Sequence, residues 1–210
     1  MTEAAERTPW MFYTIKALAQ WLEYDRPGGS ALRSDDLPIV RRWMAFYRIA
    51  RNFPGLGDDN VLRDLLFDVL EATRRIEHAG TQESQLVQEV QRIAANHGQN
   101  QLISSASKLL FLACPERGVI YDRNARTALG LRQQATYERY VLAWKTSLAE
   151  CKPQIEGAIQ RCLQLPDEAF PLYLACSSSC RSALREPWFV RRVFDIYLWH
   201  TGAQKAKRNQ

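Results

Sequence analysis

The residues whose types and spacing could carry chemistry lie in the segment 102–126. The segment reads as an apolar helix, a proline-glycine turn, a short extended apolar piece and then Asp122 at the start of another helix. Lys108 on the first helix offers an amine, and Asp122 offers a carboxylate. A carboxylate stabilises developing positive charge, and a neutral amine is a nucleophile. Two plainer interpretations stay open, since an aspartate is a common helix N-cap and a lysine is common on a solvated helix face.

This segment resembles the 8-oxoguanine DNA glycosylase-like branch of the helix-hairpin-helix DNA glycosylase superfamily. In that family an apolar pair precedes an aspartate that begins a helix, and a lysine lies upstream on the preceding helix. A second, shorter similarity runs from Arg192 to Trp199, where a closing helix contains an aspartate and a Leu-Trp pair. The resemblance is confined to these two segments.

The resemblance implies an enzyme that cleaves the N-glycosidic bond of a modified or damaged base, after the base is flipped out of DNA. In that chemistry Asp122 stabilises positive charge on the sugar, and Lys108 attacks the sugar or lines the pocket. The resemblance also implies phosphate contacts and a base pocket with stacking walls. The phosphate contacts would come from Ser104, Ser105, Arg123, Arg126, Arg191 and Arg192, and the pocket from Trp199 and Phe194.

The chain departs from the family pattern in the spacing of its two catalytic candidates. Lys108 precedes Asp122 by 14 residues, about one helical turn less than in the family, and Ser104 stands one turn upstream. The hairpin at 98–101 reads GQNQ and lacks a clear Gly-x-Gly. These departures favour a second function class, a non-catalytic glycosylase-like module that binds DNA or a protein partner in a larger bacterial assembly. A helical protein-interaction module without a DNA role is a third alternative.

Basic side chains gather in two parts of the chain. The whole chain carries a formal charge of +5, with 28 Lys and Arg against 23 Asp and Glu. Residues 181–210 hold seven basic and two acidic side chains, and residues 103–147 hold seven and three. If these two segments meet in the fold, they form one basic cleft around Asp122, which favours DNA as the partner. If they lie apart, the charge contributes only to solubility.

Apolar residues recur at helical spacing along the chain, and no segment shows sustained strand alternation. The pattern predicts one all-α domain over residues 1–210, with flexible tails at 1–8 and 203–210; the resemblance implies a helix-hairpin-helix glycosylase-like fold. We expect a break at 26–30, where the sequence reads RPGGS, and separate helices at 134–151 and 154–164. Gly80 is predicted to end one helix and Thr81 to start the next.

Composition and motifs exclude several classes. The chain is 46% hydrophobic and 24% charged, typical of a globular protein, and its longest apolar run is far shorter than the roughly 20 residues of a membrane span. The acidic start MTEAAE argues against a secretory signal, so we expect a cytoplasmic protein with no membrane partner. With five cysteines, no Cys-x-x-Cys and three histidines, we expect free thiols, no metal and no cofactor.

Overall fold

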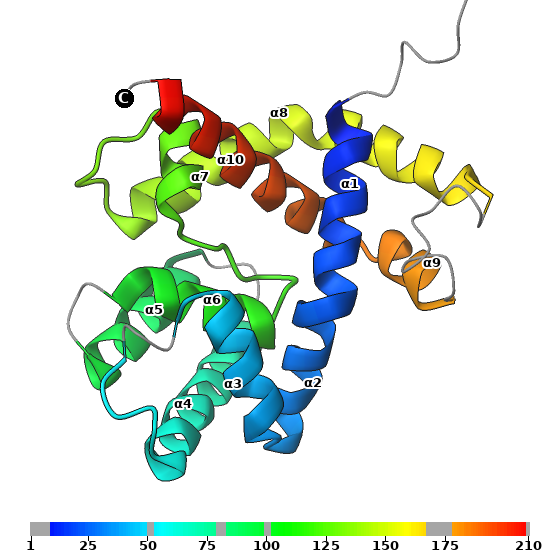
Figure 1. Cartoon of the computed structure of the whole chain (residues 1–210). Helices are drawn as coiled ribbons and strands as arrows, with labels where there is room; N and C mark the ends of the chain where they lie inside the picture. Colours follow the sequence, from blue (N-terminus) through cyan, green and yellow to red (C-terminus); the bar gives the residue numbers. More distant parts are fainter. Residues whose placement is uncertain (1–8, 50–52, 79–82, 99–101, 167–177, 209–210) are drawn as a thin grey trace, which may run out of the picture. The chain divides into compact units, whose positions relative to one another are not determined.

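The computed structural model describes residues 9–49, 53–78, 83–98, 102–166 and 178–208 (Figure 1). Most of these residues are helical, and they include no strand. The elements in chain order are α1 (Pro9–Gln20), the π-helix η2 (Trp21–Asp25), α2 (Arg26–Ser34), α3 (Leu37–Phe46), α4 (Asp59–His78), α5 (Glu83–His97), α6 (Ile103–Ala113), α7 (Arg123–Ala128), α8 (Tyr137–Gln164), α9 (Ser178–Arg185) and α10 (Phe189–Arg208). The predicted all-α class is confirmed, while the glycosylase-like fold stays a prediction.

The chain divides into two compact units, which we describe one at a time. Unit 1 consists of residues 1–22, 123–134 and 142–210, and unit 2 consists of residues 23–122 and 135–141. Helices α1, α7, α9 and α10 belong to unit 1 and α2 to α6 belong to unit 2, while α8 contributes to both. The single domain over 1–210 stays a prediction.

In unit 2, the expected break at 26–30 is wrong, because these residues form the first half of α2. Pro27 lies in the first turn, where a helix makes no use of the N–H that proline lacks. Gly28 and Gly29 are buried, and a Cβ atom at Gly28 would lie 2.8 Å from the ring of Trp43 in α3. The two glycines therefore allow close helix packing rather than a turn.

The segment after α6 lies directly against that helix. A Cβ atom at Gly118 would overlap the main chain of Phe111 in α6, so only glycine permits this approach. Three residues on, the Tyr121 N–H donates a hydrogen bond to Ser107 Oγ at 2.9 Å, and that hydroxyl donates in turn to the Ser104 carbonyl at 2.9 Å. These contacts fix the extended segment that ends at Asp122.

The apolar residues of this segment predict its extended conformation. In place of a partner strand, tyrosine hydroxyls donate hydrogen bonds to its main-chain carbonyls. Tyr137 donates its hydroxyl proton to the Val119 carbonyl at 2.7 Å, and Tyr140 donates to the Ile120 carbonyl at 2.8 Å. All four residues are buried, where an unpaired carbonyl would be costly. The start of α8 thus holds the segment on the side away from solvent.

In unit 1, α10 packs against α7 and α1 (Figure 1). A Cβ atom at Gly202 of α10 would overlap the main-chain carbonyl of Asn124 in α7, so the two helices touch backbone to backbone. Asp195 of α10 is buried and accepts a hydrogen bond from Trp144 Nε1 of α8 at 2.8 Å. Phe194 packs edge-on against the same indole, with ring centres 5.4 Å apart.

Two expected boundaries in unit 1 are wrong. The helices predicted at 134–151 and 154–164 are one helix, α8, with Pro153 inside it. Trp144 before the proline and Ile155 after it are both fully buried, and this burial offsets the roughly 3 kcal/mol that an internal proline costs. The tail predicted at 203–210 is helical as far as Arg208, since α10 continues without interruption.

Several sequence predictions fall outside the described residues. These are the tail at 1–8, the boundary at Gly80 and Thr81, most of the hairpin at 98–101, and Cys176. Within the ranges that the structure describes, none of the helices combines the length and the apolar character that crossing a membrane requires.

The contact between α10 and α7 predicts that alanine will change the free energy of unfolding in opposite directions at two helical glycines. We expect Gly202→Ala to lower the free energy of unfolding by about 1–3 kcal/mol, because the new methyl group overlaps a main chain that cannot move aside. Gly157→Ala is the matched control, since its Cβ meets only the Arg161 guanidinium at 3.7 Å; alanine there should add about 0.5–1 kcal/mol. Urea unfolding measures both, and equal effects would contradict the packing.

Candidate functional site

The two catalytic candidates lie together in unit 2. Lys108 Nζ is 3.9 Å from Asp122 Oδ2, and the side chains are 14% and 22% exposed. Lys108 lies in the middle of α6, and Asp122 ends the extended segment directly before α7. The separation is that of an ion pair rather than a tight hydrogen bond. The structure thus brings the predicted amine and carboxylate into contact at a mostly buried position.

A third group meets the lysine from α3. The Lys108 ammonium donates a hydrogen bond to the Tyr47 carbonyl at 3.4 Å. Tyr47 caps the C-terminal end of α3, where unpaired carbonyls carry partial negative charge that favours a cation. Lys108 therefore lies between a carboxylate and the negative end of a helix.

Tyr47 is itself anchored on a buried carboxylate. Its hydroxyl donates to Asp25 Oδ1 at 2.5 Å, and Trp43 Nε1 donates to the same oxygen at 3.2 Å. Asp25 is fully buried and ends η2, directly before α2. Sequence reasoning missed both Asp25 and Tyr47. The available signal was an aspartate two residues before Pro27, which marks a helix start.

The Lys108–Asp122 pair can act in two ways, which depend on whether Lys108 is charged or neutral. As an ammonium, Lys108 has no lone pair, so it stabilises negative charge and fixes the position of Asp122. As a neutral amine, it is a nucleophile beside a carboxylate. The Asp122 carboxylate can stabilise positive charge that develops on a substrate at the same position. Both functions need the extended segment to stay docked on α6.

The residues of α6 and α7 that are predicted to contact phosphate differ in how far their side chains are exposed. Ser105 is buried and Ser104 is half-buried, and the Ser104 carbonyl already accepts the Ser107 hydroxyl. Arg123 is exposed and Arg126 is half-buried, and both lie in unit 1. Of these four, Arg123 is thus the residue best placed to meet a phosphate.

The residues of α10 that are predicted to contact phosphate or base also differ in exposure. Arg192 and Phe194 are buried in unit 1, so neither side chain is presented to a ligand. The Arg191 guanidinium lies 4.7 Å above the Trp144 ring, a cation–π contact within the unit. Trp199 is 45% exposed and presents its indole to solvent.

The net positive charge belongs to one unit. Unit 1 holds 15 Lys and Arg against 8 Asp and Glu, while unit 2 holds 13 against 15. Helices α1, α7, α9 and α10 together contain a single acidic residue, the buried Asp195. The basic segment 103–147 is shared between the units. The Lys108–Asp122 pair therefore lies in the unit that is close to neutral, and the cationic surface lies in the other.

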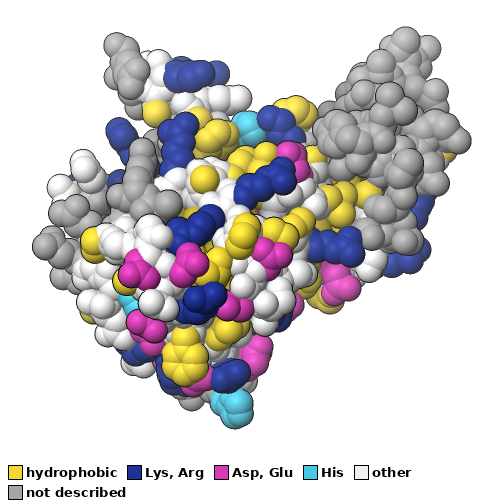
Figure 2. All heavy atoms as spheres, turned by 60° about the horizontal axis from the view of Figure 1, so that its bottom comes forward, with side chains coloured by type: hydrophobic (Ala, Val, Ile, Leu, Met, Phe, Trp, Pro, Cys, Tyr) yellow, Lys and Arg dark blue, Asp and Glu magenta, His cyan; other side chains and the backbone are white. Residues whose placement is uncertain are grey.

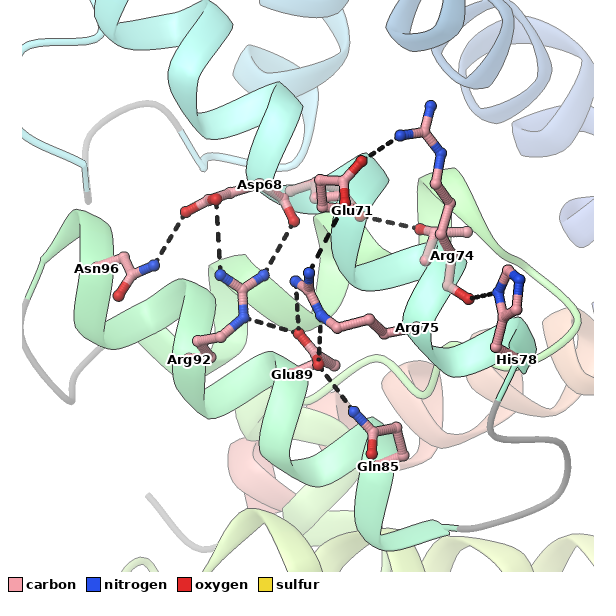
Figure 3. Close-up of polar contacts among 11 residues, drawn as sticks. Asp68, Glu71, Arg74, Arg75, His78, Gln85, Glu89, Arg92 and Asn96 are labelled. Carbon is pink, nitrogen blue, oxygen red and sulfur yellow. Dashed lines mark hydrogen bonds and ion pairs between the residues drawn. The ribbon is translucent and has the colours of Figure 1, made fainter.

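Unit 2 has a second polar cluster between α4 and α5 (Figure 3). Glu89 of α5 accepts two hydrogen bonds from Arg75 of α4, at 2.8 and 3.1 Å, and one from Arg92 at 2.8 Å. Figure 3 shows the two guanidinium groups on either side of the carboxylate. Burial alone would raise the pKa of Glu89, but the hydrogen bonds and charges of the two arginines outweigh it, so the pKa is lowered.

Asp68 extends this cluster toward the end of α5. Its carboxylate accepts from the Asn96 amide at 3.0 Å and contacts His97 Nε2 at 2.9 Å, while Arg92 lies 3.6 Å away. Burial pushes the pKa of Asp68 upward, yet these three partners lower it overall. The cluster therefore holds α4 to α5 through charges that satisfy one another.

A shallow hollow beside the cluster carries no separate chemistry. Its lining residues are Glu71, Arg74, Arg75, His78 and Gln85. Each of them takes part in the polar contacts drawn in Figure 3, including His78 Nδ1 on the Arg74 carbonyl at 2.6 Å. Figure 2, which brings the α4 end of the molecule forward, shows acidic and basic side chains interspersed. This face resembles an ordinary solvated surface.

The cysteines within the described ranges are free. Burial raises the pKa of the Cys114 thiol to about 12 and that of Cys162 to about 11, and such thiols are poor nucleophiles at neutral pH. In the same ranges, no three His, Cys, Asp or Glu side chains are grouped so that they could hold a metal ion.

No protein family, curated protein or solved structure matches this chain. The geometry of the Lys108–Asp122 pair and the charge of unit 1 therefore carry the functional argument.

The cluster around Glu89 predicts an acid-sensitive contribution to stability. We expect Glu89→Gln to lower the free energy of unfolding by about 1–3 kcal/mol at neutral pH, because two arginines lose a buried partner. The folded pKa of Glu89 is below its ordinary value of 4.5, so the folded state binds fewer protons than the unfolded one. The contribution is therefore complete above that value and is lost as the pH falls through the lowered pKa.

Chemical denaturation of wild type and Glu89→Gln at several pH values checks this prediction. Glu71→Gln is the control, since that carboxylate is 30% exposed in its ion pairs and should contribute less than about 1 kcal/mol. A difference between wild type and Glu89→Gln that does not shrink in acid would contradict the expected ionisation of Glu89.

Proposed function

We propose that this protein cleaves the N-glycosidic bond of a modified or damaged base in DNA. The observation that carries the proposal is the 3.9 Å contact between Lys108 Nζ and Asp122 Oδ2, two residues 14 positions apart in the segment that resembles the glycosylases. Catalysis of this bond cleavage needs a carboxylate beside the sugar, and a lyase also needs an amine there. Both groups are available at one place.

Asp122 supplies the electrostatic part of the reaction. As the base departs with the bonding electron pair, positive charge builds on the sugar, and a fixed carboxylate nearby stabilises it. The Asp122 carboxylate is positioned by the extended segment, which Ser107 and the two tyrosines of α8 hold in place. Little reorganisation is then needed when the charge develops.

Lys108 supplies the nucleophile once it has lost its proton. The amine lone pair forms a bond to C1′ of the sugar as the glycosidic bond breaks, and the departing base takes up the proton that the attacking nitrogen releases. Opening of the sugar ring then gives an imine between Lys108 and the former C1′, which borohydride reduces to a stable amine. If water attacks in place of Lys108, the base is released and no imine forms.

The charge of unit 1 supports DNA as the substrate. Its helices α1, α7, α9 and α10 expose basic side chains and no acidic one, and a polyanion binds such a surface by releasing its counterions. Arg123 directly follows Asp122 in the sequence, so a phosphate contact there would lie next to the carboxylate along the chain.

A second candidate is a DNA-binding module without catalysis. The observation that favours it is the contact of Lys108 with the Tyr47 carbonyl at 3.4 Å, because an ammonium held by both this carbonyl and Asp122 resembles a structural ion pair. This candidate predicts salt-sensitive DNA binding that Asp122→Asn leaves unchanged, with no base released by wild type. Fluorescence anisotropy across a salt series measures the binding.

Borohydride trapping tests the catalytic proposal. Wild type is incubated with duplex oligonucleotides that carry an oxidised, deaminated or alkylated base, and sodium borohydride is added. We expect a covalent protein–DNA adduct that is absent in Lys108→Gln and reduced about 100-fold or more in Asp122→Asn.

The matched controls are Lys152→Gln and Glu156→Gln, which remove an exposed ion pair of similar length, 3.7 Å, in α8. They should trap like wild type. An adduct that persists in Lys108→Gln would contradict the role of this amine. Circular dichroism of each variant ensures that a lost adduct reflects lost chemistry rather than lost folding.

A further inference from the structure

Unit 1 exposes a group of aromatic rings where α1 meets α10. Phe12 of α1 is 53% exposed and Trp199 of α10 is 45% exposed. Between them lies His200, whose ring centre is 6.1 Å from that of Phe12 and 5.0 Å from that of Trp199. We call these three rings, together with Lys16, the aromatic platform.

The platform rests on a second row of rings. Tyr13 lies 5.3 Å from Phe12 and 5.4 Å from Tyr197 between ring centres, and Tyr197 lies 4.5 Å from the buried Trp10. Trp10 is held in turn by a hydrogen bond from its Nε1 to Gln154 at 2.7 Å. Phe12 and His200 are therefore packed against supporting rings, which lowers the entropy cost of stacking a ligand on them.

Lys16 places a positive charge on this platform. Its ammonium lies 4.8 Å from the centre of the Phe12 ring and 3.3 Å from His200 Nε2. Burial and, after it, the charge of Lys16 lower the pKa of His200 from 6.5. At neutral pH the imidazole is then uncharged and accepts from the ammonium, which leaves an aromatic face with one cation beside it.

The charge of the two helices that form the platform, α1 and α10, indicates the class of partner. Helix α1 has no acidic residue, and the single one in α10, Asp195, is buried. The last turn of α10 adds Lys205, Lys207 and Arg208. Exposed rings next to cations, without an exposed carboxylate on either helix, combine the two features that bind single-stranded nucleic acid, since bases stack on the rings and phosphates meet the cations.

We propose that the aromatic platform binds unpaired nucleotides of single-stranded DNA. A fully paired duplex offers no free base face except at its ends, so the platform should prefer single strands or unpaired ends. This inference goes beyond the proposed bond cleavage. It concerns residues of unit 1 alone, and it requires neither Lys108 nor Asp122.

The test is the affinity of wild type and variants for a fluorescently labelled oligothymidylate, measured by anisotropy at low salt. We expect Phe12→Ala and Trp199→Ala each to weaken binding by about fivefold or more. Lys16→Gln should reduce the magnitude of the slope of log affinity against log salt by about 0.7, the value for one phosphate contact on a single strand. A blunt-ended, fully paired duplex of the same length should bind more weakly than the single strand.

The matched controls are Leu142→Ala in unit 1 and Phe67→Ala in unit 2, both of which remove a side chain that is 63% exposed. They should bind like wild type. Equal losses in controls and platform variants would overturn the proposal, as would equal affinity for single strand and fully paired duplex or no binding at low salt. So would a homodimer in sedimentation that Phe12→Ala dissociates, since a second copy would then occupy the platform.

Asp122→Asn separates this inference from the proposed catalysis. It should bind oligothymidylate like wild type, whether or not the protein forms an adduct with modified duplexes. Loss of oligothymidylate binding in this variant would contradict an independent platform.

Discussion

The candidate site depends on the docking of one extended segment, 118–122, against α6. Glycine at position 118 allows the segment to approach the helix main chain, and the Ser107 hydroxyl receives the Tyr121 N–H. Two tyrosines at the start of α8 donate hydrogen bonds to its Val119 and Ile120 carbonyls. Without this docking Asp122 would not lie beside Lys108, because the two residues belong to different elements. The contact between Lys108 and Asp122 therefore depends on the packing of the segment as much as on the attraction between the two charges.

Local signals predicted much of the helix pattern, and tertiary contacts account for the failures. Asp36 is the N-cap of α3 and accepts a hydrogen bond from the Ile39 N–H, in agreement with the capping preference of aspartate. The pair of glycines in α2 predicts a break by local rules alone, because no sequence rule shows that Trp43 and Leu112 lie against them. The continuity of α8 through Pro153 was missed for the same reason. In both cases burial against other parts of the chain, rather than the local residue types, accounts for the helix.

The candidate site was predictable to a similar degree. The resemblance indicated Lys108 and Asp122, and the structure places them in contact. Tyr47 and Asp25 were missed, since they are 61 and 97 positions away from Lys108 and Asp122 respectively, and nothing local connects them. The base pocket expected at Phe194 is core, because α10 buries that ring against Trp144. Burial of an aromatic residue on an apolar helix depends on which neighbours pack against it, and the sequence does not show this.

The net positive charge and the two catalytic candidates lie in different units of this chain. Unit 2 contains the amine and carboxylate, whereas unit 1 contains the cationic helices and the exposed rings. The catalytic candidates and the proposed strand-binding platform therefore belong to different units. For this reason the net charge of +5 does not indicate where the Lys108–Asp122 pair lies.

The most direct measurement of the central claim is single-turnover release of free base from a modified duplex, detected by mass spectrometry. The account predicts that wild type releases base, that Asp122→Asn does so about 100-fold or more slowly, and that Glu156→Gln matches wild type. Release at equal rates by wild type and Asp122→Asn, or no release by wild type from any modified duplex, would contradict it.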